Sequence, residues 1–107
     1  MATVPPCSHL DQVVLDRLPE EVPGCEDCLR TGDGWVHLRI CLTCGHVGCC
    51  DSSPNRHASK HARGEGHPLI RSLEPGEDWS WCFEDEVAMR IAGITGDPRI
   101  PPSPLLS

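Results

Sequence analysis

Three segments of the chain carry the hydrophobic pattern of β-strands. The segment WVHLRI, residues 35–40, has an aliphatic side chain at every second position, and a period of two is typical of a strand with one buried face. The segments HPLIRSL, residues 67–73, and WSWCF, residues 79–83, predict two further strands, because the turn-forming residues EPGED separate them. The pattern therefore predicts several short strands.

Two other segments carry helix patterns. Ser53 is a favourable N-cap and Pro54 a favourable first helical residue, so this pair predicts a helix that runs to about Ala62 and stops at the glycines that follow. The segment EDEVAMRIAG, residues 84–93, has an amphipathic pattern and predicts a short second helix closed by its terminal glycine.

The predicted organisation is a single domain over residues 1–93, followed by a flexible tail over residues 94–107. The tail, ITGDPRIPPSPLLS, is rich in proline and poor in hydrophobic periodicity. The first 24 residues end in the turn-forming EVPG and predict only a short turn or helix around VVLDRL.

Composition indicates that apolar burial alone gives this domain little stability. The 107 residues include one phenylalanine, three tryptophans and no tyrosine, so large core-filling side chains are scarce. A chain of this length buries a modest fraction of its surface on folding. An additional stabilising element is therefore expected.

Eight cysteines supply that element either as disulfides or as metal ligands. The N-terminus lacks a basic region followed by a continuous apolar run, and no apolar run reaches transmembrane length. These features predict a cytoplasmic protein with no membrane partner. In a reducing compartment, Cys-x-x-Cys pairs mixed with histidines indicate zinc.

The net charge excludes one common role of zinc fingers. Sixteen acidic residues against nine basic ones give a charge of −7. Affinity for nucleic acid comes largely from neutralising phosphates with lysine and arginine. No nucleic-acid partner is therefore expected.

Two Cys-x-x-Cys pairs and four downstream residues account for two tetrahedral zinc sites. Each pair can present two thiolates to one ion from a tight turn. The eight candidate ligands are Cys25, Cys28, Cys41, Cys44, Cys49, His57, His61 and His67. Helical geometry favours His57 and His61 on one zinc, while nesting along the sequence offers other pairings, so spacing does not decide between them.

A third group of candidate ligands comes from the two ends of the domain. Cys7 and His9 lie near the start and Cys82 near the end, and the segment FEDE that includes Asp85 offers carboxylates as a fourth ligand. The alternative is that these are an ordinary terminal cysteine, a surface histidine and a buried thiol.

The ordered pattern of these residues resembles the UBP-type zinc finger, the ubiquitin-binding module of certain deubiquitinases and of a cytoplasmic histone deacetylase. The residues that carry it are Cys25, Cys28, Trp35, Cys41, Cys44, Cys49, His57, His61, the GHPL segment with His67, Trp81 and Cys82. The resemblance implies a small zinc-stabilised α+β domain, with an antiparallel sheet of about five strands and two helices. No protease or deacetylase domain accompanies it, so a free-standing, non-catalytic module is expected.

The resemblance also implies how the ligands are shared among three zinc ions. Site one would use Cys25, Cys28, Cys49 and His57, and site two Cys41, Cys44, His61 and His67. Site three would use Cys7, His9 and Cys82. Family members complete that third site with a cysteine where this chain has Asp85, so Asp85 is predicted as its fourth ligand, with Glu84 or Glu86 as substitutes.

The binding residues of the family are only partly retained. Ubiquitin-binding members hold the tail carboxylate of ubiquitin with an arginine where this chain has Asp51, and an aspartate there disfavours that carboxylate. The aromatic walls of the pocket would be Trp35, Trp81 and Phe83. Arg39 or Arg56 could supply a replacement cation.

These observations predict a zinc-binding recognition module for a peptide or protein C-terminus, with ubiquitin disfavoured as the partner. One alternative is a thiol sensor, because Cys50 has no zinc role and adjoins a predicted ligand. Another is a zinc hydrolase, which needs an open metal position that only site three could offer. An acidic docking surface on EPGEDWSWCFEDE is a further possibility within the binding class.

Overall fold

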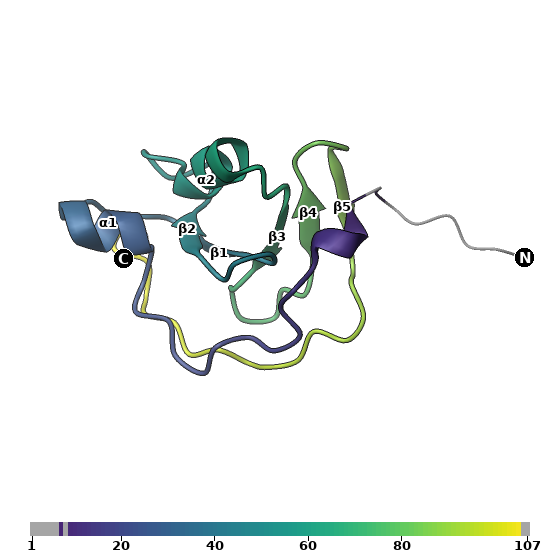
Figure 1. Ribbon diagram of the computed structural model, residues 1–107. Helices are drawn as coiled ribbons and strands as arrows, with labels where there is room; N and C mark the ends of the chain where they lie inside the picture. Colours follow the sequence, from purple (N-terminus) through teal and green to yellow (C-terminus); the bar gives the residue numbers. More distant parts are fainter. Residues whose placement is uncertain (1–6, 8, 106–107) are drawn as a thin grey trace, which may run out of the picture.

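The computed structural model describes residues 7 and 9–105 and shows a five-stranded antiparallel sheet with two α-helices (Figure 1). The predicted α+β architecture is therefore confirmed. The elements, in chain order, are a 3-10 turn η1 (Leu10–Gln12), α1 (Glu26–Thr31), β1 (Leu38–Cys41), β2 (Val47–Cys49), α2 (His57–Glu65), β3 (Leu69–Ser72), β4 (Ser80–Cys82) and β5 (Val87–Met89).

The strands lie in the order β2-β1-β3-β4-β5, and every neighbouring pair is antiparallel. In the centre of the sheet, Ile70 of β3 lies opposite Cys41 of β1 on one side and Trp81 of β4 on the other. Side chains alternate between the two faces of a strand, so Ile70 and Trp81 share a face. This face carries the pocket described below.

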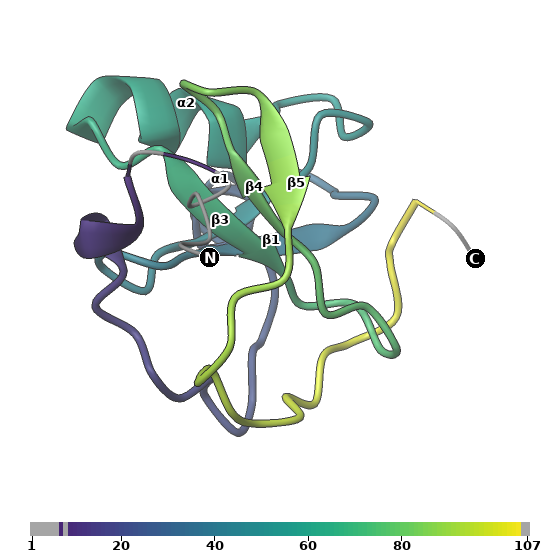
Figure 2. The ribbon, with the colours of Figure 1, turned by 90° about the vertical axis from the view of Figure 1, so that its right-hand side faces the viewer.

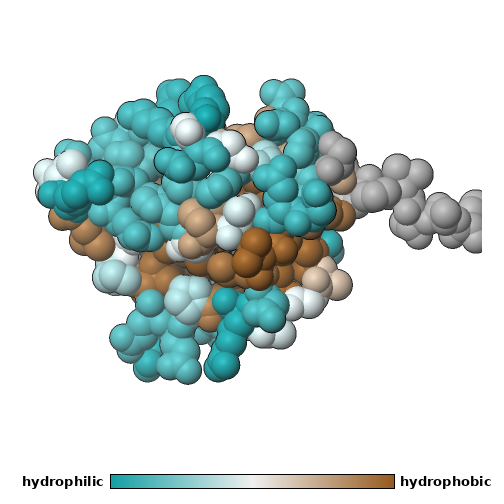
Figure 3. All heavy atoms as spheres, in the orientation of Figure 1, coloured by the Kyte–Doolittle hydropathy of each residue, from teal (hydrophilic) through white to brown (hydrophobic). Residues whose placement is uncertain are grey.

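The two faces of the sheet are covered by different parts of the chain. The helix α2 packs on β1 and β2, while the extended segments 13–22 and 94–100 run side by side across the other side of the domain (Figures 1 and 2). Buried aliphatic side chains such as Leu38, Ile40 and Leu69 fill the space between sheet and segments. Hydrophobic residues also form a band across the middle of the face shown in Figure 3.

The helix α1 is a feature that the hydrophobic pattern did not predict. It begins at the first Cys-x-x-Cys pair, where the backbone N–H of Cys28 donates to Sγ of the N-cap Cys25 at 3.4 Å. Glu26 and Asp27 occupy its first turn, where carboxylates interact favourably with the helix dipole. Gly32 ends the helix in the left-handed conformation. The cysteine spacing that indicated a metal site thus also starts a helix.

The predicted helix over residues 84–93 is wrong, because residues 84–86 belong to a turn and residues 87–89 form β5. Glu86 adopts a left-handed backbone conformation with φ of 52°, in the turn that reverses the chain between β4 and β5. Val87, Ala88 and Met89 then pair with Cys82, Trp81 and Ser80. Pairing with β4 therefore decides the conformation of the segment, in spite of its amphipathic pattern.

The helix α2 begins three residues later than Pro54 predicts. Its N-cap is Arg56, with φ of 50°, and it ends at Gly66 as expected. Ser53 caps no helix, because its buried hydroxyl accepts a hydrogen bond from the backbone N–H of Val36 at 2.8 Å. Neither α1 nor α2, the two α-helices of the described ranges, is long and apolar enough to cross a membrane.

The described part of the C-terminal tail lies against the domain. Thr95 forms a parallel bridge with Arg17, and the hydroxyl of Ser103 donates to the carbonyl of Trp35 at 2.8 Å. The mobility of the tail and the boundary after Gly93 stay predictions. Residues 1–6, 8, 106 and 107, which fall in the predicted domain and tail, lie outside the described residues.

The close contact between β2 and α2 predicts a strong effect of Gly48→Ala. A β-carbon at Gly48 would lie 2.7 Å from the backbone nitrogen of Ala58 on α2. Because the helix would have to move away, the substitution is expected to lower the free energy of unfolding by about 1–3 kcal/mol in urea denaturation with zinc present. Gly64→Ala is the matched control: no atom lies within 4 Å of the added carbon, and alanine in a helix should raise stability by about 0.5–1 kcal/mol. Equal stability of the two variants would contradict this account of the packing.

Candidate functional site

The first group of predicted ligands comes together at the junction of α1, β2 and α2. Nδ1 of His57 lies 3.3 Å from Sγ of Cys25, 3.3 Å from Sγ of Cys28 and 3.5 Å from Sγ of Cys49. The Cys28 and Cys49 sulfurs are 3.9 Å apart. The four donor atoms all lie within 4.8 Å of one another.

This donor geometry fits a tetrahedral zinc ion. Zinc bonds of about 2.0–2.3 Å imply donor separations of roughly 3.3–3.8 Å, close to those found here. Burial, together with the hydrogen bonds and charges of the neighbouring thiols, raises the pKa of Cys28 to about 12. Burial also raises the pKa of Cys25. Several thiolates can therefore share this space only when a cation neutralises them.

The second group lies at the other end of α2. Sγ of Cys44, in the turn after β1, is 3.2 Å from Nε2 of His61 on α2, and Sγ of Cys41 is 3.6 Å from Nδ1 of His67. All four donor atoms lie within 4.8 Å of one another. Burial and the nearby imidazoles of His46 and His67 lower the pKa of His61, which favours the neutral form that binds metal.

His57 and His61 therefore belong to different groups. Helical spacing alone favoured one shared zinc, but the two cysteine pairs approach α2 at different turns. His57 meets the α1 pair through Nδ1 and His61 meets the β1 pair through Nε2. One short helix thus joins two donor groups.

A histidine outside both groups supports the second one. The ring of His46 stacks on His61 with centroids 4.4 Å apart and planes 6° from parallel. Its Nε2 lies 2.8 Å from Asp27 of α1, which also pairs with Arg30. Burial raises the pKa of the Asp27 carboxyl, but the hydrogen bonds from His46 and Arg30 outweigh it and hold that pKa below its usual value. Sequence reasoning missed His46, because only the fold stacks it on a ligand.

The third group links the two ends of the domain. Nδ1 of His9 lies 3.4 Å from Sγ of Cys82 and 3.4 Å from Oδ2 of Asp85, and the backbone N–H of His9 donates to Sγ of Cys7 at 3.4 Å. The donor atoms of these four residues are all within 4.8 Å of one another. The structure thus brings Asp85, rather than the adjacent glutamates, into the group.

Glu84, which the sequence offered as a substitute fourth ligand, lies outside the third donor group. Its Oε2 lies 2.8 Å from Nε2 of His9, on the side of the ring opposite to Cys82 and Asp85. A carboxylate on the outer nitrogen of a ligand histidine fixes the tautomer and the ring orientation. Glu84 is therefore placed to orient His9.

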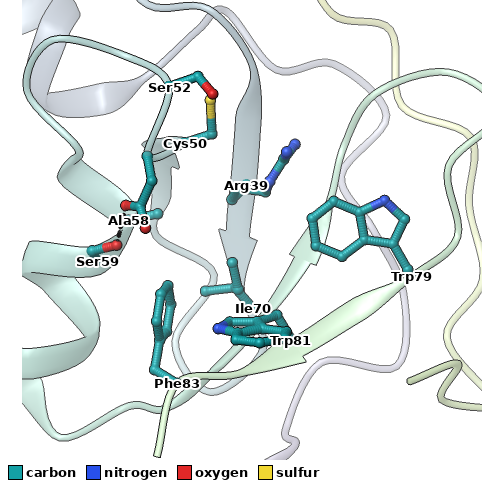
Figure 4. Close-up of a pocket in the computed structure, with 10 residues that line it drawn as sticks. Arg39, Cys50, Ser52, Ala58, Ser59, Ile70, Trp79, Trp81 and Phe83 are labelled. Atoms are coloured by element: carbon teal, nitrogen blue, oxygen red, sulfur yellow. Dashed lines mark hydrogen bonds between the residues drawn. The ribbon is translucent and has the colours of Figure 1, made fainter. Parts of the chain in front are cut away.

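A pocket of about 270 Å³ lies on the sheet face beside α2 (Figure 4). Its aromatic residues Trp79, Trp81 and Phe83 come from β4 and the residues that flank it, and Ile70 of β3 lies at its base. The rest of its lining consists of Arg39, Cys50, Asp51, Ser52, Ala58 and Ser59.

Three of the four predicted pocket residues line this cavity: Asp51, Trp81 and Phe83. The structure does not bring Trp35 to it. Trp35 is 7% exposed, and its ring packs against Gly24 so closely that a β-carbon there would collide with it. A small domain with few aromatic residues uses this side chain in its core.

Of the two arginines considered as replacement cations, Arg39 lines the pocket and Arg56 does not. The Arg39 guanidinium lies 4.6 Å from the centroid of the Trp79 ring, a cation–π contact. Sequence reasoning did not place Trp79 in the pocket. Its spacing of two residues from Trp81 and four from Phe83 was a usable signal, since alternate residues of a strand share a face.

Cys50 also lines the pocket, but its side chain is buried. Its Sγ lies 3.5 Å from Oγ of Ser53. Burial raises the pKa of the Cys50 thiol, but the hydrogen bonds of Ser53 and of backbone groups, with the charge of Arg39, outweigh it and bring that pKa below its usual value.

Comparisons with known proteins agree with this geometry. A family model described as a zinc finger in ubiquitin hydrolases and other proteins matches residues 25–91, more than half of the chain. Zebrafish (Danio rerio) ubiquitin carboxyl-terminal hydrolase 16 is 32% identical over 110 aligned residues, which cover 83% of this chain and 13% of that protein. Its mouse (Mus musculus) counterpart is 45% identical over 49 residues, covering 42% and 6%. The chain thus spans a small part of these hydrolases.

A solved structure matches nearly the whole chain. The solution NMR structure of protein RPA1320 from Rhodopseudomonas palustris is 44% identical and superposes with a TM-score of 0.73. The match covers 95% of this chain and 97% of the bacterial one.

The stacked His46 predicts an effect on zinc retention. His46→Ala removes the ring that packs on His61 and the contact to Asp27, and loss of such outer partners typically weakens metal binding about 10–100-fold. We expect a faster transfer of one zinc ion to a chromophoric chelator, by about tenfold or more. His37→Ala, at the other histidine outside the three groups, should release zinc at the wild-type rate. Identical rates for both variants would show that the stack has no such role.

Proposed function

Because the chain belongs to the family of zinc fingers found in ubiquitin hydrolases and other proteins, we propose that it is a non-catalytic recognition module that binds a peptide or protein C-terminus in the pocket beside α2. The observation that carries this proposal is the meeting of Arg39 with three aromatic side chains in one cavity. Arginine binds carboxylates through paired hydrogen bonds, and aromatic walls exclude water around them.

The chain is a zinc-binding module, as the family match and the cysteine and histidine groups indicate. Our proposal assigns it three zinc ions, one to each group. The ions would neutralise the buried thiols and link segments that the thin apolar core does not hold together. The domain without zinc is proposed to be largely unfolded.

The proposed module has no catalytic zinc. A catalytic site keeps one metal position open for water. Each of the three groups offers four protein donors, and Asp85 supplies the fourth donor of the third group. This complete set supports structural roles over the alternative of a hydrolase.

We propose that the ubiquitin tail is a poor ligand for this pocket. Asp51 lines the cavity and would repel a carboxylate that approaches the side of α2. Arg39 lies on a different element, β1, so a bound carboxylate would occupy a different place from the one that an arginine at position 51 would give it.

The proposal includes a reducing, cytoplasmic location, in which the eight cysteines stay reduced and seven of them are available as metal ligands. No disulfide joins any of them, and all eight lie in the described part of the chain. The alternative function of a thiol sensor at Cys50 gains no support from the burial of that side chain, which is 6% exposed. Zinc release by mild peroxide that disappears in Cys50→Ala would favour the sensor instead.

The third zinc ion can be tested by stoichiometry. Purified wild-type protein is expected to contain three zinc ions by mass spectrometry under native conditions, and Asp85→Ala to contain two, because the third group loses one of its four donors. Glu84→Gln is the matched control, since the Glu84 carboxylate pairs with the outer nitrogen of His9 and lies outside the donor group. This variant should keep three ions and exchange one of them faster. Two ions in the wild type would make Cys7, His9 and Cys82 ordinary residues.

Ubiquitin binding gives a second test. Titration of the zinc-loaded protein with free ubiquitin and with ubiquitin blocked at its C-terminus is expected to give weak binding in both cases. The physical reason is the negative charge of Asp51 at the pocket. Tail-dependent binding at micromolar strength or tighter would show that Asp51 does not exclude the tail.

A further inference from the structure

Two side chains of opposite charge line the same pocket without neutralising each other. Arg39 lies on β1 and Asp51 in the loop between β2 and α2. Among residues 7 and 9–105, neither forms an ion pair within 4.0 Å, with the other or with any third residue. The cavity therefore offers a cationic and an anionic position at once.

Asp51 is held in place by the helix beside it. The hydroxyl of Ser59, a residue of α2 that is 5% exposed, donates a short hydrogen bond to Oδ1 of Asp51 (Figure 4). This contact uses one carboxylate oxygen. Among residues 7 and 9–105, no group forms a hydrogen bond with the other carboxylate oxygen. That oxygen is therefore available to accept a hydrogen bond from a ligand.

Arg39 is also held in place, on the opposite side of the cavity. Its guanidinium stacks on Trp79, and Nη1 donates to the carbonyl of Leu38 at 3.0 Å and to Oγ of Ser72 at 3.3 Å. These contacts restrain the position of the guanidinium. A group that is positioned before binding loses less conformational entropy when a ligand arrives.

An apolar floor separates the two charges. Figure 4 shows Ile70, Trp81 and Phe83 along the lower side of the pocket, with Arg39 and Trp79 above them on one side and Ser59 and Ala58 on the other. A volume of about 270 Å³ is just below the range of small-ligand sites, about 300–1,000 Å³. The pocket therefore suits one or two residues of a peptide.

We infer that this pocket selects a chain terminus whose last residue is lysine or arginine. This inference rests on the proposed function, because it assumes that a C-terminus enters the cavity. The terminal carboxylate pairs with Arg39, the side-chain cation pairs with Asp51, and the alkyl stem lies over Trp81 and Phe83. A tail that ends in glycine offers no cation to Asp51, so it gains nothing at that position.

The test compares four fluorescently labelled hexapeptides that differ only at the last residue, titrated against the zinc-loaded protein. Three carry a free carboxylate and end in lysine, in norleucine or in glycine, and the fourth ends in lysine amide. The lysine peptide is expected to bind about tenfold more tightly than the norleucine peptide, which has the same stem without the charge. Amidation should weaken binding by a similar factor, because it removes the carboxylate.

Matched variants assign each charge to its residue. Asp51→Asn is expected to abolish the preference for lysine over norleucine and to leave the norleucine affinity unchanged or higher. Arg39→Gln should weaken all three free-carboxylate peptides. Asp97→Asn, at an exposed carboxylate outside this pocket, should change neither preference. Zinc content equal to that of the wild type shows that each variant is folded.

The outcomes separate this inference from the proposed function. Equal binding of the lysine, norleucine and glycine peptides would overturn the inference while the recognition of a terminus stands. Equal binding of lysine and lysine amide would overturn both, because the carboxylate would have no role. Binding of none of the four peptides would likewise refute the proposed function and the inference together.

Discussion

The rest of the structure depends on the position of the two imidazoles of α2 between two cysteine pairs. His57 meets the pair at the start of α1, and His61 meets the pair at the end of β1. Burial raises the pKa of the Cys25 and Cys28 thiols, so these residues need a cation between them to be present together as thiolates. The helix α2 has nine residues and is too short to be stable by itself. Its two histidines link it to α1 and to the sheet.

The same helix connects the metal groups to the pocket. Ser59 follows His57 by two residues and holds Asp51, and Gly48 of β2 admits the helix backbone at close range. The pocket charges are thus positioned by elements that carry metal-ligand groups. The third group adds the other wall, because Cys82 and Asp85 flank Phe83 and tie the end of β4 to the N-terminal segment.

Local sequence and tertiary context disagree at specific places for identifiable reasons. The amphipathic pattern of residues 84–93 is compatible with a helix. However, residues 87–89 form a strand, because the backbone of β4 offers them hydrogen-bond partners that are not available to a helix. Ser53 has the side chain of a helix cap, yet its hydroxyl accepts a hydrogen bond from the backbone N–H of Val36 instead. In both cases the deciding partner is distant in the chain, and no local pattern contains it.

The sequence by itself determined the donor inventory and the need for metal, because ligand chemistry and cysteine spacing are local properties of the chain. Its resemblance to a family also indicated the α+β class and how the ligands divide. Only the tertiary structure decided that Trp35 belongs to the core, that Trp79 and Arg39 belong to the pocket, and that His46 stacks on His61. These facts depend on which strand faces meet and which way each side chain turns, and long-range packing sets both.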